Sequence, residues 1–188
     1  MKKYLMTLAA VLCCAMTTTV FTACGDDDEP TSKAEDNTPK KVSIGFVLNN
    51  TADMLKYCDI ELSYDNGKGK SETVKLNGDN ALAVQLDLSS ELPATFKVSR
   101  KVTLKQGIEN PTKFEYTKYV SYIYALYNAA DKKIGADYQE GFGNSGKAES
   151  AEKAAQLMEK INAGFLDYDY TFAFNSKGEV SFSYSEEL

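Results

Sequence analysis

Histidine and tryptophan are both absent from this chain of 188 residues. Without histidine the chain has no Ser-His-Asp or Cys-His catalytic group, no histidine-ligated zinc and no imidazole proton shuttle. Carboxylates would have to carry any acid–base catalysis. The sequence therefore argues against an enzyme, and it predicts neither a bound metal nor a cofactor.

Basic residues are also scarce relative to acidic ones. The chain has 21 Lys and Arg against 27 Asp and Glu, a net charge of −6, and Arg100 is the single arginine. The basic residues form no patch along the chain, so nucleic acid is not an expected partner. A mild negative charge favours solubility instead.

The N-terminus has the layout of a secretory signal over residues 1–23. Lys2 and Lys3 precede an uncharged run whose apolar core reads YLMTLAAVLCCAM, and small residues close it at positions 22 and 23. About 20 uncharged residues could instead form a transmembrane helix. Three consecutive threonines, residues 17–19, shorten the apolar core and favour the signal.

A lone cysteine, Cys24, stands between this run and four consecutive acids in FTACGDDDE, residues 21–29. The segment resembles the lipobox of bacterial lipoproteins, in which the cysteine becomes the first mature residue and is acylated. Phe21 departs from the usual leucine. The acidic run resembles the surface-export signal of lipoproteins in Bacteroidetes. The resemblance covers residues 1–29 and implies an outer-membrane protein attached through lipid at Cys24. It is expected to face the cell exterior, with a periplasm-facing position as the alternative.

Lipid attachment leaves Cys58 without a cysteine partner. Cys13 and Cys14 would leave with the signal, and Cys24 would be consumed by the lipid. No intrachain disulfide is then possible. Cys58 shares the strand phase of Ile60 and Leu62, which predicts a buried and unreactive thiol.

Residues 24–40 have the composition of a tether. They lack large apolar side chains after Cys24, they are rich in acids, and they contain Pro30 and Pro39. Such a segment is expected to be disordered, with a root-mean-square span of roughly 25 Å. It would hold the remaining chain away from the membrane.

From Lys41 onward apolar residues alternate with polar ones, in short runs bounded by Gly, Asn, Asp or Pro. This pattern predicts antiparallel hairpins with one buried face. In the run 71–77, Val74 and Leu76 are expected to face inward. We therefore predict a single mostly β domain, residues 41–188, folded as an antiparallel two-layer, immunoglobulin-like sandwich. A small lipocalin-like barrel is the alternative.

One helix is predicted over residues 149–163, where Ala154, Met158 and Ile161 recur at steps of three and four. Ser150 is the expected N-cap and Gly164 the expected C′ residue.

The segment 119–127 shows helical and strand spacing together, but its Tyr, Val and Ile content favours a strand that returns after a turn at 128–131. Both faces of that strand are apolar. Tyr119, Ile123 and Ala125 are therefore expected to receive the helix.

Two sequence patterns resemble catalytic or cofactor sites only weakly. Gly141, Gly143 and Gly146 satisfy the spacing G-x-G-x-x-G, but the preceding run is polar and no repeated βαβ pattern follows, so a loop is expected. Asp167 and Asp169 would lie about 7 Å apart on one strand face. A solvated face is favoured over the carboxylate pair of a hydrolase.

Tyr138 and Phe142 flank a polar, glycine-rich segment, residues 139–149, that is expected to be a loop. Loops carry binding residues more often than strands do. These two aromatic residues are therefore the candidate ligand edge. Most other tyrosines share strand phase with aliphatic residues and are expected in the core.

The predicted function is that of a lipid-anchored cell-envelope protein, a surface binding or accessory module for a glycan, a peptide or a partner protein. A structural or assembly subunit of a surface appendage is the first alternative. A carrier of an apolar small molecule inside a barrel is the second. Apart from the membrane, the sequence identifies no partner.

Overall fold

The computed structural model describes residues 36–65, 69–78 and 81–185, and only the backbone of residues 138–142. The predicted signal, Cys24 and residues 25–35 lie outside the described part of the chain. No helix in the described part has the length and apolar composition needed to span a membrane.

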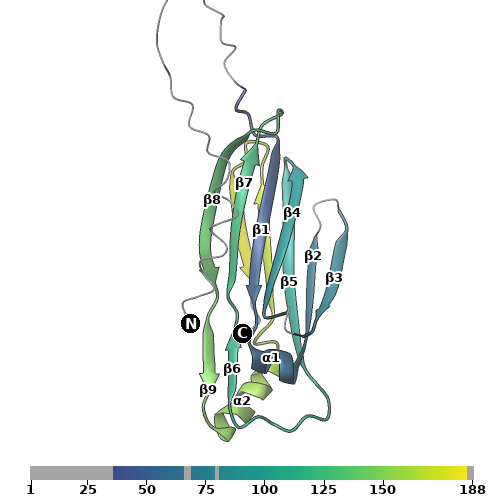
Figure 1. The fold of residues 1–188 in the computed structure, drawn as a ribbon, viewed down its shortest axis with the longest axis vertical. Coiled ribbons are helices and arrows are strands. Elements are labelled where there is room, and N and C mark those ends of the chain that lie inside the picture. The colour runs from purple at the N-terminus through teal and green to yellow at the C-terminus, as the bar shows by residue number, and fades with distance from the viewer. Residues whose placement is uncertain (1–35, 66–68, 79–80, 186–188) are drawn as a thin grey trace, which may run out of the picture. The chain divides into compact units, whose positions relative to one another are not determined.

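Most of the described chain is antiparallel β structure, arranged as two large sheets and a two-stranded ribbon (Figure 1). Sheet A has the order β4 (Ala83–Glu91), β1 (Lys41–Asn49), β7 (Val120–Tyr127), β8 (Lys133–Phe142). Sheet B has the order β11 (Val180–Ser185), β10 (Tyr168–Phe174), β5 (Ala94–Leu104), β2 (Cys58–Asp65), β3 (Ser71–Leu76). The ribbon pairs β6 (Phe114–Thr117) with β9 (Ser145–Ala148).

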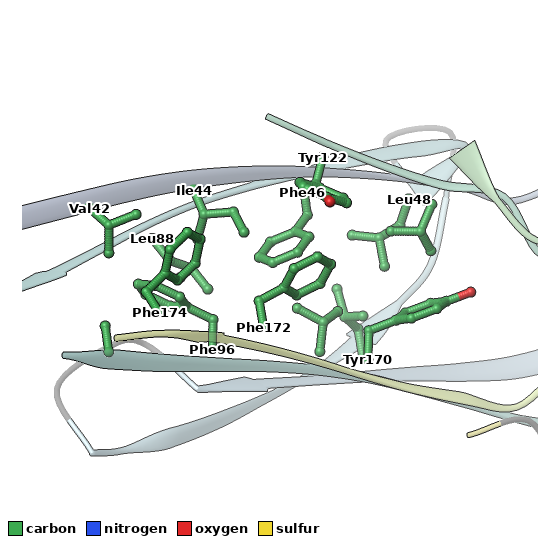
Figure 2. Close-up of a cluster of buried hydrophobic side chains, with 14 of the residues drawn as sticks. Val42, Ile44, Phe46, Leu48, Leu88, Phe96, Tyr122, Tyr170, Phe172 and Phe174 are labelled. Carbon is green, nitrogen blue, oxygen red and sulfur yellow. The ribbon is translucent and has the colours of Figure 1, made fainter. Parts of the chain in front are cut away.

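The two sheets pack face to face around side chains that the strand alternation turns inward. Along β1, Val42, Ile44, Phe46 and Leu48 are buried while the residues between them are half-buried. Figure 2 shows Phe46 and Tyr122 of sheet A against Phe172 of sheet B, with ring centroids 5.1 and 4.5 Å apart. Contacts between aromatic rings at these distances stabilise a core beyond simple area burial.

The mostly β, antiparallel fold is therefore confirmed, and it is consistent with the predicted sandwich. The lipocalin-like alternative is wrong, because the described strands form separate sheets and do not close into a barrel. The sheet order by itself does not establish an immunoglobulin-like topology.

Two helices cover one end of sheet B. α2 (Ala151–Asn162) begins after Ser150, whose Oγ accepts a hydrogen bond from the amide of Lys153 (3.4 Å), and Gly164 follows the helix with φ +90°. Both termini are as the sequence predicts. α1 (Ala52–Tyr57) has six residues. The alternation of apolar and polar residues does not predict it. Thr51 caps it by accepting from the amide of Met54.

The prediction that α2 packs on Tyr119, Ile123 and Ala125 is wrong. The apolar stripe of α2 instead joins a second core, formed with α1, β2, β5, β6 and β9 (Met54, Cys58, Ile60, Val102, Phe114, Ala148, Ala154, Leu157, Met158, Ile161, Leu166). β5 and the ribbon extend beyond sheet A at that end, as Figure 1 shows. The helices cover the apolar side chains of β5 and the ribbon at that end, whereas Tyr119 is exposed.

Candidate functional site

The candidate ligand edge does not lie on a loop. Tyr138 and Phe142 belong to β8, and the expected loop 139–149 consists largely of β8 and β9. Tyr138 is paired with half-buried Ile123 and Phe142 with buried Val120, and a register shift separates the two pairs. The side chains of Tyr138 and Phe142 are outside the described residues, so their role stays a prediction. Cys24 is also outside them.

The glycine-rich motif is explained by close packing of strands. Gly143 has φ +99°, and a Cβ there would collide with the carbonyl oxygen of Lys118. A Cβ at Gly146 would lie 2.8 Å from the hydroxyl oxygen of Tyr116, its partner in the ribbon. The glycines therefore allow the bend between β8 and β9, and α2 begins only after β9.

The two candidate carboxylates have different roles. Asp167 precedes β10, and its Oδ1 accepts a hydrogen bond from the amide of Val102 at 2.7 Å. Backbone pairing of β10 with β5 stops at Tyr168 and Arg100. The carboxylate thus takes the place that a strand carbonyl would occupy, while Asp169 is exposed. No group of three or more His, Cys, Asp or Glu side chains within the described residues could hold a metal ion.

Arg100 is buried between the two cores, with 2% of its surface exposed. Its guanidinium donates to the carbonyl oxygens of Leu166 (3.0 and 3.2 Å) and Thr117 (3.0 Å). It also reaches the Asn49 carbonyl (3.4 Å) and Asn50 Oδ1 (3.1 Å). Burial lowers the pKa of Arg100, although arginine stays charged in proteins. These acceptors lie at the end of β1, at the end of β6 and in the connection before β10, so Arg100 joins these three segments to β5.

Two buried groups near Arg100 resist ionisation. Burial raises the pKa of Tyr168 to about 12 and that of the Cys58 thiol to about 11. Cys58 is free and buried, as the sequence predicts. A neutral phenol and a neutral thiol with pKa values this high are poor nucleophiles at neutral pH. Both groups therefore stay neutral at neutral pH.

The segment Asp36–Lys40, the end of the predicted tether, contacts the domain beside the β7–β8 turn. Asn128 is buried and donates from Nδ2 to the carbonyl oxygen of Asp36 (2.9 Å), while its Oδ1 accepts from the amides of Ala130 and Lys132 (3.0 Å each). The amide of Lys40 donates to the carbonyl of Tyr127 (2.8 Å). Asp36, the first residue that the structure describes, is therefore held at this end of the domain.

An open cleft of about 800 Å³ lies at the same end (Lys40, Lys41, Ser89, Ser90, Glu91, Leu92, Asn128, Ala129, Asp131). Most of its lining residues are polar, and an exposed ion pair joins Lys41 Nζ to Asp131 Oδ1 at 3.4 Å. Small-molecule sites are typically enclosed and lined by apolar side chains. This cleft does not have that character.

The long side of the domain formed by β4 and β3 has a feature that the sequence does not predict, which we call the edge slot (Tyr64, Glu72, Val74, Val84, Leu86). β4 is the edge of sheet A, whereas sheet B continues past it through β2 and β3 (Figure 1). Val74 pairs with buried Leu62 and so lies on the inner face of sheet B, yet it is 43% exposed. The expectation that Val74 is buried is wrong, because no strand of sheet A among the described residues covers β3.

The other wall of the edge slot is β4. Leu86 and Val84 pair with buried Phe46 and Leu48 of β1, so both belong to the inner face of sheet A, and both are only half-buried. Tyr64 and Glu72 complete the slot, with the Tyr64 hydroxyl donating to Glu72 Oε2 at 2.8 Å. The slot is an apolar strip open to solvent between the edges of two sheets.

Comparisons of the chain with protein-family models, with curated proteins and with solved structures give no match.

Proposed function

We propose that this chain is a lipid-anchored protein of a bacterial outer membrane, attached at Cys24. Its immunoglobulin-like β-sandwich domain would serve as a surface binding or accessory module. Sandwiches of this kind present loops and strand edges at their ends and sides for recognition. The sequence of residues 21–29 supports the anchor. An anchor of this type holds stably when two or more acyl chains enter the membrane.

The observation that carries this proposal is the position of Asp36–Lys40. This segment is held at the end of the domain that carries the β7–β8 turn, through Asn128 and Tyr127. α1, α2 and the ribbon lie at the opposite end (Figure 1). The point where the predicted tether joins the domain therefore lies at the end remote from α1, α2 and the ribbon.

Replacement of Cys24 by serine tests the anchor. The wild-type chain is expected in the membrane pellet and the Cys24→Ser chain in the soluble fraction. Cys58→Ala is the matched control, because it removes the other cysteine of the mature chain and leaves the anchor. A Cys24→Ser chain that stays in the pellet would overturn the proposal. Protease treatment of intact and lysed cells then distinguishes display on the exterior from a periplasm-facing position.

A structural or assembly subunit is the second candidate function, and the edge slot favours it. Assembly by strand addition needs an unpaired edge and an exposed inner face, and β4 and β3 supply both. The apolar carrier has less support, because side chains fill the space between the sheets.

A further inference from the structure

We propose that the edge slot binds one extended segment of a partner protein, which adds to β4 as a fifth strand of sheet A and covers β3. This inference rests on the proposed function, since it names the class of partner that the binding module takes. It commits to a polypeptide rather than a glycan, because both walls of the slot are strand edges.

The backbone of β4 has a strand neighbour on one side only within the described residues. All nine residues of β4 pair with β1, and the strand order leaves its other side at the edge of sheet A. An edge strand presents a row of N–H and C=O groups that another strand can bind. Natural edges are commonly protected by lysine or proline. β4 contains neither, and its charged residues are Asp87 and Glu91.

Apolar side chains of β3 and β4 are partly exposed along the slot. A strand added beside β4 would direct alternate residues toward the inner face of β3. There Val74 is 43% exposed, and Val84 and Leu86 are half-buried. Apolar residues at every second position of the partner would cover these side chains. Main-chain hydrogen bonds would supply affinity and the alternate side chains would supply specificity.

The length of β3 and the connection between β3 and β4 limit how many residues the slot can bind. β3 has six residues. The connection to β4 crosses between the sheets and is held by Asn50, which binds the carbonyl oxygens of Leu82 (backbone amide, 2.9 Å) and Ala81 (Nδ2, 2.7 Å). The slot can therefore bind a partner segment of about six residues, which is roughly 20 Å long when extended.

Charged side chains of both signs lie at one end of the slot. Glu72 lies in the slot, and Asp65 pairs with Ser71 at the same end of β3, where Lys70 is exposed. Glu91 ends β4 and pairs with Lys41. The expected partner segment is therefore defined by its alternating apolar residues.

Two other occupants are excluded. The chain's own residues 24–35 read CGDDDEPTSKAE and have no alternating apolar residues to cover Val74. A second copy cannot pair through its own β4, because each β3 would then have to lie beneath the partner's β4. That position is already taken by the partner's β2, which is next to β3 in sheet B. One strand fits where a second sandwich does not.

The test uses the purified full-length chain in detergent and a labelled peptide with the sequence KTVTVTVSG. A scrambled peptide of the same composition, without alternation, is the control probe. Fluorescence anisotropy measures affinity, and hydrogen exchange locates the bound strand. We expect the alternating peptide alone to bind and to slow amide exchange in β4.

Two variants on one strand separate binding from stability. Val74→Lys places a charge in the slot and should weaken binding by about tenfold or more. Thr73→Lys changes the adjacent residue, on the outer face of β3, and should bind as the wild type does. Both positions are exposed, so both variants are expected to fold.

Several results would overturn the inference. They are no binding at about 1 mM peptide, equal binding by the Val74→Lys variant, and protection of β11 or β8 in place of β4. Dimerisation through β4 without peptide would also overturn it. None of these measurements depends on lipid attachment, whereas the fractionation of Cys24→Ser depends on it alone. The two proposals therefore fail separately.

Discussion

Arg100 and Tyr168 are cross-strand neighbours, and the guanidinium carbon of Arg100 lies 4.5 Å from the centroid of the Tyr168 ring. The ring belongs to the core between the sheets, and Leu166, which accepts two hydrogen bonds from Arg100, belongs to the core beneath the helices. The guanidinium therefore contacts an aromatic face and backbone carbonyls at the junction of the two cores.

Replacement of Arg100 by methionine should destabilise the domain by about 3 kcal/mol or more. It leaves the carbonyls of Leu166 and Thr117 buried without their donor, and each such group costs about 1–3 kcal/mol. Urea unfolding measures the change. Lys101→Met alters the exposed neighbour on the same strand and should change stability by less than about 0.5 kcal/mol. Equal stability of the two variants would contradict this role.

Replacement of Tyr168 by phenylalanine should flatten the loss of stability at alkaline pH. The folded-state pKa of Tyr168 is raised to about 12 from 10.0, so its contribution is complete below pH 10 and is lost as pH rises through 12. At pH 7 the variant should be as stable as the wild type or more so, because the hydroxyl has no hydrogen-bond partner within the described residues. Urea unfolding at pH 7 and from pH 9 to 12 tests both points.

Cys58 should react with a thiol reagent only when the domain unfolds. It is 1% exposed, and burial raises its thiol pKa to about 11, so little thiolate exists at pH 8. The measurement is the rate of labelling by an aromatic disulfide reagent with increasing urea, in the Cys24→Ser background. Fast labelling without urea would show that the thiol is accessible in the native state.

Asp167→Ala should cost about 1–3 kcal/mol, because the buried amide of Val102 then loses its acceptor. Asp169→Ala, two residues along the chain, removes an exposed side chain and should cost less than about 0.5 kcal/mol. Thermal unfolding of the two variants compares them. If both losses were small, the carboxylate of Asp167 would not complete the pairing between β5 and β10.

Asn128→Ala should release the segment Asp36–Lys40 from the domain and make it sensitive to protease. Asn175 is the matched control. Its Oδ1 likewise accepts two backbone amides in a turn, from Lys177 (2.9 Å) and Glu179 (3.1 Å), and its Nδ2 donates to the Glu179 side chain. Mass spectrometry after limited proteolysis should show cleavage near residue 38 in Asn128→Ala only. Equal cleavage in both variants would mean that Asn128 does not hold the segment.

Much of the fold was predictable because the alternation of apolar and polar residues indicates which face of a strand is buried. The hairpins at 58–76, 120–142 and 168–185 follow that pattern. Both termini of α2 follow from its capping residues, Ser150 and Gly164. Alternation gives the face of a strand but not its neighbour in the other sheet. Val74 was therefore expected to be buried, although no strand covers it.

The sequence alone determined the residue types available for chemistry, the strand faces and the capped helix, since these depend on composition and on neighbours within a few residues. Only the tertiary structure decided that sheet B extends one strand beyond sheet A and that α2 covers the end of sheet B. It also decided that Asp36 is held at Asn128. Each of these depends on contacts between segments far apart in the chain, which local periodicity does not encode.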